Sequence, residues 1–102
     1  MRLLVAILVA TVIVSACSLG APDEDATGEE IYAELCAHCH GADLSGGIGP
    51  PLGPGSEAAA ETDEFLEFTI MNGRGRMPSF SSSLDENQLD RLIDFMRDGG
   101  GP

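Results

Sequence analysis

Two cysteines and a histidine lie close together in the stretch Cys36-Ala37-His38-Cys39-His40. Two thiols separated by two residues can bond both vinyl-bearing edges of one haem, and a His directly after the second thiol then lies beneath the iron. This C-x-x-C-H spacing is the signature of c-type haem attachment. It predicts one covalent haem c held by Cys36 and Cys39, with His40 as the proximal iron ligand.

Other chemistries of the same residues remain open. A thioredoxin-like redox dithiol would follow a strand in a βαβ pattern, and no such pattern precedes Cys36. A zinc site would need a second pair of ligands farther along the chain, where the sequence has no further Cys or His. A structural disulfide between Cys36 and Cys39 is the third alternative. His38 occupies the variable position of the motif and is expected to be an exposed helix residue.

The composition limits what kind of domain can surround this motif. The chain has 102 residues with no Trp, one Tyr and four Phe, so it can build only one small core. Domains of this size usually need a disulfide, a metal or another staple, and a bound haem would add apolar mass. The net charge is −12 and Lys is absent, which excludes the basic surface of a nucleic-acid-binding protein.

The N-terminal segment predicts export. Met1-Arg2 is followed by an apolar run over residues 3–14, interrupted only by Thr11. The run has the length of a signal-peptide core and is too short to span a membrane. Val14-Ser15-Ala16-Cys17 resembles the lipobox of bacterial lipoproteins, in which the Cys is acylated. Acylation of Cys17 also accounts for the odd third cysteine. An ordinary signal peptide cut near Ala16, or an uncleaved anchor, is the alternative.

Helical periodicity is visible in three segments, and no segment shows the alternation of a strand. The first runs from Gly28 to His38, with Thr27 and Glu30 as a capping box. The second runs from Thr62 as N-cap to about Asn72. Its side chains available for burial are Phe65, Phe68, Thr69 and Met71. The third starts at the capping box Ser83-Leu84-Asp85-Glu86 and stops before Gly99. Its apolar side chains are Leu89, Leu92, Ile93 and Met96.

Over nearly all of residues 28–98 the chain resembles the class I monohaem cytochromes c, specifically their small bacterial and photosynthetic members. Gly28 with Ile31-Tyr32 resembles the N-terminal helix of that family, which crosses the C-terminal helix near right angles. The resemblance implies three packing partners on the C-terminal helix, which are Leu92, Ile93 and Phe95. The Gly- and Pro-rich residues 41–56 are then expected to form a loop that wraps around the haem.

Two further motifs of the family assign roles by resemblance. Gly49-Pro50-Pro51-Leu52 is similar to a segment in which the Pro carbonyl accepts a hydrogen bond from the proximal His, which implies that Pro50 orients His40 and that Leu52 packs on the haem. The segment 72–80, Asn-Gly-Arg-Gly-Arg-Met-Pro-Ser-Phe, is similar to the loop that carries the sixth iron ligand, here Met77.

The same loop leaves two questions open. Met77 could instead be core filler, although Met71 and Met96 fit that role better because each lies in a predicted helix. Arg74 and Arg76 could pair with the haem propionates or could be solvated loop charges.

Together these observations predict an all-α protein with three to four helices around one covalently bound haem. We expect a signal peptide over residues 1–16, an acidic tether over 17–26 and the cytochrome domain over 27–102. The resemblance implies a monomeric single-electron carrier, not an enzyme. It would be lipid-anchored outside the cytoplasm and would shuttle electrons between membrane redox complexes, at least one of which has a basic docking patch. The alternatives are a haem-based sensor of small ligands and a redox subunit of a larger oxidase or dehydrogenase.

Overall fold

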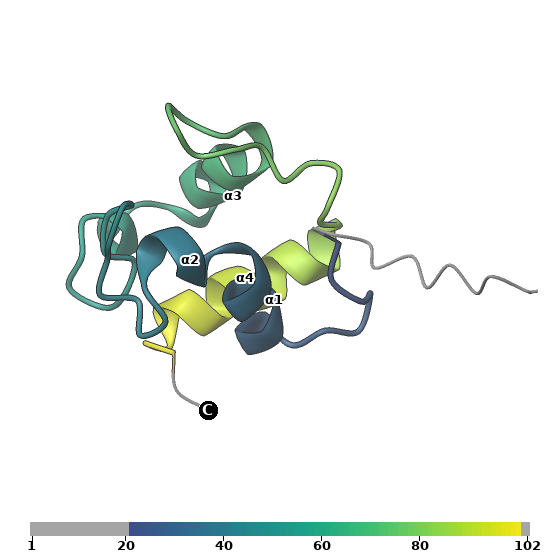
Figure 1. Ribbon diagram of the computed structural model, residues 1–102, viewed down its shortest axis with the longest axis horizontal. Helices are drawn as coiled ribbons and strands as arrows, with labels where there is room; N and C mark the ends of the chain where they lie inside the picture. Colours follow the sequence, from purple (N-terminus) through teal and green to yellow (C-terminus); the bar gives the residue numbers. More distant parts are fainter. Residues whose placement is uncertain (1–20, 101–102) are drawn as a thin grey trace, which may run out of the picture.

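The computed structural model describes residues 21–100, and within them the chain is helical (Figure 1). The elements in chain order are α1 (Gly28–Leu35), α2 (Ala37–His40), a 3₁₀ helix η1 (Ala58–Ala60), α3 (Asp63–Asn72) and α4 (Glu86–Arg97). The described residues contain no strand, and their one isolated bridge pairs Arg74 with Met77. The predicted all-α class is therefore confirmed.

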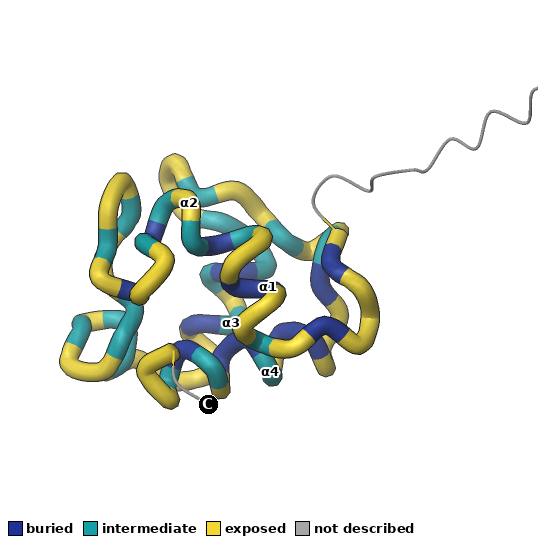
Figure 2. The backbone as a smooth tube through the Cα atoms, turned by 60° about the horizontal axis from the view of Figure 1, so that its bottom comes forward, coloured by how far each residue is buried: buried dark blue, intermediate teal, exposed yellow. Residues whose placement is uncertain are grey.

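The core is centred where α1 lies across α4 (Figures 1 and 2). A Cβ atom at Gly28 would come within 2.8 Å of Phe95 Cβ and still closer to the Arg91 carbonyl oxygen, so only glycine permits this approach. The rings of Tyr32 and Phe95 pack with their centroids 5.5 Å apart at 47°. The most deeply buried side chains are Tyr32, Ile31 and Leu92. The expected packing of the two terminal helices is confirmed.

The first helix differs from its predicted extent. Thr27 caps α1, because its hydroxyl accepts a hydrogen bond from the Glu30 N–H at 3.1 Å. The helix then stops at Leu35 instead of continuing to His38, and Cys36 adopts φ −117° and ψ −37° between α1 and α2. The apolar periodicity runs on across this break, so the pattern could not reveal it.

The last helix begins two residues later than predicted. Asp85, not Ser83, is its N-cap: the Asp85 carboxylate accepts a hydrogen bond from the Gln88 N–H, and the Gln88 side chain accepts one from the Asp85 N–H, both at 2.8 Å. Asp-x-x-Gln satisfies the capping-box pattern as well as Ser-x-x-Glu does. The predicted apolar side is confirmed, since all four of its side chains are buried: Leu89, Leu92, Ile93 and Met96.

The buried side of α3 was predicted wrongly. Thr62 caps the helix as expected, accepting a hydrogen bond from the Phe65 N–H at 3.1 Å. The side chains that bury are Leu66 and Ile70, one turn apart, whereas Phe65 and Phe68 are 39% and 68% exposed. Of the other side chains expected to be buried, Thr69 and Met71 are half-buried. Phe68 lies two residues from both Leu66 and Ile70, so it points away from the side that packs on α4.

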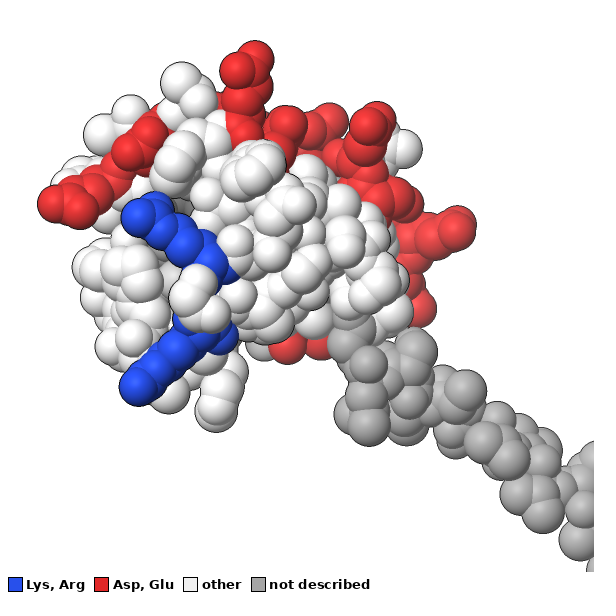
Figure 3. All heavy atoms as spheres, turned by 90° about the horizontal axis from the view of Figure 1, so that it is seen from above, with Lys and Arg blue, Asp and Glu red and all other residues white. Residues whose placement is uncertain are grey.

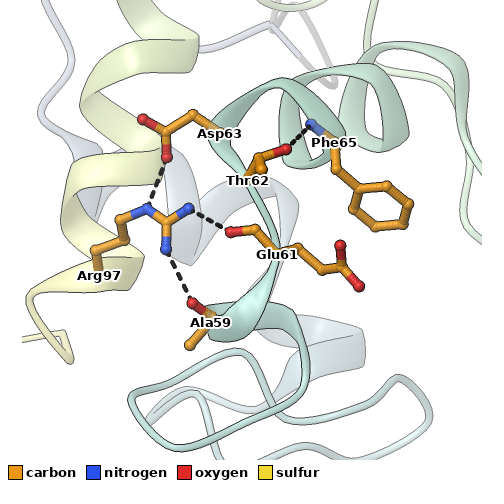
Figure 4. Close-up of polar contacts among 6 residues, drawn as sticks. All are labelled: Ala59, Glu61, Thr62, Asp63, Phe65 and Arg97. Atoms are coloured by element: carbon orange, nitrogen blue, oxygen red, sulfur yellow. Dashed lines mark hydrogen bonds and ion pairs between the residues drawn. The ribbon is translucent and has the colours of Figure 1, made fainter.

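Arg97 joins the end of α4 to the start of α3 (Figure 4). Its guanidinium donates hydrogen bonds to Asp63 Oδ1 at 2.7 Å, to the Glu61 carbonyl oxygen at 2.9 Å and to the Ala59 carbonyl oxygen at 3.1 Å. These contacts hold the connection between η1 and α3 against α4. Two of them go to backbone carbonyls, so they fix the path of the chain itself.

The N-terminal part of the described chain is bound to α4 and not free of it. Four backbone carbonyls accept hydrogen bonds from two α4 side chains: Gln88 Nε2 donates to Pro22 (3.2 Å) and Asp23 (3.0 Å), and Arg91 donates to Glu24 (2.6 Å) and Ala26 (2.9 Å). The folded part thus starts before Thr27, and residues 22–26 of the predicted tether belong to it. The remaining division of the chain stays a prediction.

The predicted signal peptide, residues 1–16, and Cys17 lie outside the described residues. Among residues 21–100, no helix has the length and apolar character needed to cross a membrane.

Candidate functional site

The two cysteines and His40 lie on a single helical turn. Because α1 stops at Leu35, the Cys36 carbonyl accepts hydrogen bonds from the N–H groups of Cys39 at 3.2 Å and His40 at 3.0 Å. Cys36 and His40 are buried, Cys39 is half-buried, and both thiols are free. His38 points outward and is exposed, as expected. This turn presents two sulfur atoms and one imidazole from neighbouring positions.

The imidazole of His40 is held from one side. Its Nδ1 atom lies 2.7 Å from the Pro50 carbonyl oxygen, so Nδ1 donates the hydrogen bond and carries the proton. The contact that the Gly-Pro segment predicts is present. Within the described residues, Nε2 has no hydrogen-bond partner, which leaves it as the nitrogen that can bind a metal.

Gly49 fits directly against the same ring. A Cβ atom at this position would lie 2.8 Å from Cε1 and 2.9 Å from Nδ1 of His40, so any other residue would displace the imidazole. The Gly49 N–H also donates to the Cys39 carbonyl at 2.7 Å. Backbone contacts therefore tie the 49–50 segment to the turn that carries the ligand set.

The buried Cys36 thiol is poorly suited to attack a disulfide. Burial raises the pKa of the Cys36 thiol to about 12, and the charge of Cys39 adds to the shift. A thiol that stays protonated at neutral pH is a poor nucleophile. Among residues 21–100, no three His, Cys, Asp or Glu side chains are grouped as metal ligands.

A second segment of the predicted site follows α3. The backbones of Arg74 and Met77 exchange two hydrogen bonds of 3.1 and 2.9 Å, which close a tight turn. A Cβ atom at Gly73 would come within 2.6 Å of the Met77 carbonyl oxygen, and φ is +78° there, so the turn requires glycine. The Met77 side chain is half-buried against the core. Its role as an iron ligand stays a prediction.

The other predicted site residues divide between these two segments and the loop that joins them. Leu52 is half-buried and lines a small cavity with Ala58, Leu66 and Met96. The side chains of Arg74 and Arg76 are exposed and make no hydrogen bond or ion pair with the described residues. Their pairing with the haem propionates stays a prediction.

One contact that positions the site was missed from the sequence. Tyr32 Oη donates a hydrogen bond of 2.6 Å to the Gly41 carbonyl, directly after His40. Burial raises the pKa of Tyr32 to about 12, with smaller contributions from the charges of Cys36 and Asp43. The available signal was that Tyr32 is the single tyrosine of the chain and must satisfy its hydroxyl when buried.

Comparison with known proteins decides the family. Residues 23–96 match the family model described as cytochrome c oxidase, cbb3-type, subunit III. The chain belongs to the class I cytochromes c. As a member it binds haem c covalently, and Cys36 and Cys39 are the two cysteines of its attachment motif. These residues fit haem c, because two thiols without a disulfide and one oriented imidazole lie on one turn.

Individual relatives are of different sizes. Over 62 residues the cytochrome is 44% identical to cytochrome c-551 of Bacillus subtilis (strain 168), covering 60% of this chain and 51% of that one. It is 34% identical over 85 residues to the cbb3-type cytochrome c oxidase subunit CcoP of Azospirillum sp. (strain B510), covering 74% and 29%. The chain thus spans about half the length of the first relative and less than a third of the second.

A solved structure gives the same assignment of fold. The cytochrome superimposes on the c-type cytochrome NirC with a TM-score of 0.61 and 32% sequence identity, covering 71% of this chain and 86% of NirC. The all-α class I fold around one haem is therefore shown by sequence and by structure.

Proposed function

We propose that this cytochrome is a single-electron carrier that acts outside the cytoplasm and is held on a membrane by acylated Cys17. The observation that carries the proposal is the His40 imidazole, fixed through Nδ1 by the Pro50 carbonyl with Nε2 left for iron. A ligand oriented in this way is ready to bind without rearrangement. Minimal rearrangement is what repeated gain and loss of one electron requires.

The residues have distinct roles in this proposal. The bound haem supplies an iron that changes between the ferrous and ferric states. Cys36 and Cys39 would hold the haem covalently, and His40 and Met77 would bind its iron. A His/Met pair raises the reduction potential relative to other axial pairs. Leu52, which lines the small cavity with Ala58 and Leu66, would pack on the haem.

Charge indicates how the carrier finds its partners. Residues 17–102 contain four Arg and 17 acidic residues, a net charge of −13. We infer long-range attraction to a basic patch on at least one membrane redox partner, weakening as salt rises. The carrier has no reaction of its own in this proposal, and each encounter is small and short-lived.

A second candidate function is a redox subunit within a larger oxidase or dehydrogenase. Its support is the match to a cbb3-type oxidase family and the similarity to the longer CcoP subunit. Stable co-purification with an oxidase or dehydrogenase, surviving high salt, would favour the subunit. A carrier should dissociate under the same conditions.

The test is one absorption spectrum and one mass of the exported protein. We expect a c-type haem spectrum, the methionine-to-iron band in the ferric protein, and a mass that includes one haem and acyl chains on residues 17–102. A redox titration should follow a one-electron curve. The absence of covalent haem would overturn the proposal, and ready binding of carbon monoxide by the reduced protein would favour a ligand sensor instead.

A further inference from the structure

Two of the four basic side chains of the described domain are already engaged. All 17 acidic residues lie within residues 21–100, together with only four arginines. Arg91 and Arg97 donate hydrogen bonds to backbone carbonyls within the domain, and Arg97 also donates one to Asp63. The side chains of Arg74 and Arg76 are exposed and have no partner among the described residues. The free positive charge of this domain is therefore confined to one turn.

That turn is held in a defined shape beside the proposed iron ligand. Two backbone hydrogen bonds, 3.1 and 2.9 Å long, join Arg74 to Met77, and Arg76 lies between them in sequence. Gly73 and Gly75 adopt φ of +78° and +57°, values that favour glycine. Each arginine thus projects from a fixed backbone position within three residues of Met77.

The surface next to the turn exposes two aromatic side chains among the acidic residues of α3. The outer side of α3 exposes 68% of Phe68 and 39% of Phe65, and α3 leads directly into the turn at Gly73. Figure 3, which looks onto this side of the molecule, shows a broad uncharged area with basic side chains at one border and acidic side chains around much of the rim. Exposed aromatic side chains beside Arg are typical of the centres of protein interfaces.

We propose that Arg74, Arg76 and Phe68 form the docking face of the cytochrome and that this face receives an acidic group of a redox partner protein. The inference rests on the proposed function and refines its account of the partner. The acidic remainder of the surface attracts a basic periphery at long range. At the contact itself the surface charge is positive, because both arginines lie on the Met77 turn. Such an arrangement of charges orients the partner protein as well as attracting it.

The proposal predicts that the two arginines affect the oxidation rate more than other charges of the same number, and in opposite directions for an anionic and a cationic oxidant. The reduced holoprotein is oxidised by hexacyanoferrate(III), an anion, and separately by tris(phenanthroline)cobalt(III), a cation, at low and high ionic strength. We compare Arg74→Gln/Arg76→Gln with Ala33→Glu/Asn87→Asp. Both variants carry two more negative charges than the wild type, and the control sites are exposed residues of α1 and α4.

We expect the Arg variant to lose about fivefold or more of its rate with hexacyanoferrate(III) at low ionic strength and to gain rate with the cobalt complex. The control should change less than about twofold with either oxidant, and high salt should remove the difference. Unchanged rates in the Arg variant would overturn the docking face. Equal changes in the two variants would do so too, because net charge would then explain them.

Two other outcomes distinguish failure of the docking face from failure of the proposed electron-carrier function. If Arg74→Gln/Arg76→Gln shifts the reduction potential but leaves the ratio of the two oxidation rates unchanged, the arginines serve the haem propionates and the docking face is wrong. In that case the protein still exchanges one electron, and the proposed function stands. Failure of the wild-type protein to show covalent haem or one-electron oxidation would overturn the proposed function and the docking face together.

Discussion

The junction of α1 with α4 and the region formed by α3 and its following turn are built in opposite ways. At the junction the side chains fill all available space: Ile31 and Leu92 are completely buried, and Gly28 leaves no room for a methyl group. Around α3 the chain exposes two of its four phenylalanines. The junction buries its apolar side chains within the protein, whereas the α3 region leaves apolar side chains exposed.

This difference implies that the two regions have different roles in the protein. The junction determines where the turn with Cys36 and His40 lies, because α1 leads directly into that turn and Tyr32 ties Gly41 down. The α3 region supplies the changeable half of the site, with Met77 in a tight turn and a face open to partners. We therefore expect mutations in the first region to act on folding and mutations in the second to act on the potential and on docking.

The largest expected effect comes from removing the haem, which tests whether the junction can support the fold without it. Cys36→Ala/Cys39→Ala should abolish covalent haem and leave the chain without a cooperative unfolding transition, a loss of about 5 kcal/mol or more, because the remaining core is too small. Circular dichroism with urea denaturation measures this. Cys17→Ala should keep haem and fold. A cooperative transition in the double variant would show that the junction is sufficient.

Filling the closest contact of the junction should come next in size. Gly28→Ala places a methyl group against Arg91 and Phe95 and should reduce the free energy of unfolding by about 3 kcal/mol, the upper part of the range for overpacking. Gly55→Ala is the control, since nothing lies within 4 Å of that position and only its φ of +85° is unfavourable, for about 1 kcal/mol. Equal losses in urea titrations would argue against tight packing at the junction.

A change in the second region should instead move the potential. Met77→Ala removes the proposed thioether ligand and should lower the midpoint potential by about 0.1 V or more, since axial ligands tune haem over a range of about 0.8 V. The methionine-to-iron absorption band should disappear. Met71→Ala, at a half-buried position on α3, should leave both unchanged. If both variants lowered the potential alike, Met77 would be core filler.

The smallest effect concerns the link between the junction and the site. Tyr32→Phe deletes the donor to the Gly41 carbonyl and should cost about 1 kcal/mol at pH 8. The pKa of Tyr32 is raised from 10.0 to about 12, so the stability that this group contributes is fully present below pH 10 and is lost as the pH rises through 12.

The chain has one Tyr and no Lys, so few other side chains titrate in that window. Urea unfolding of wild type and Tyr32→Phe between pH 8 and pH 12 checks the assignment. The gap between the two proteins should narrow as the pH rises. A gap that stays constant over this range would mean that the hydroxyl is not what links stability to pH.

The sequence was sufficient to predict the elements whose signals are local. The C-x-x-C-H turn, the caps Thr27 and Thr62, and the apolar side of α4 depend on neighbouring residues, and the structure contains all of them. The contact of Pro50 with His40 was predicted only through family resemblance, because its two partners are ten residues apart in an irregular loop.

The errors arose where tertiary contacts decide between equal local choices. Three apolar side chains of α3, Phe65, Phe68 and Met71, competed with Leu66 and Ile70. Only the position of α4 determined which side became buried. Residues 22–26 look like a polar tether by composition, yet their backbone carbonyls bind two side chains more than 60 residues away. Composition does not reveal backbone hydrogen bonds of this kind.

The attachment of residues 22–26 to α4 also bears on how the protein diffuses. If Cys17 carries the acyl chains, Pro22 is only five positions farther along the chain, a span of at most about 18 Å when fully extended. The domain would then stay within roughly one protein diameter of the lipid and search for partners in two dimensions. Its encounter rate would depend on how many copies share each area of membrane, and the same end of α4 would always face the bilayer.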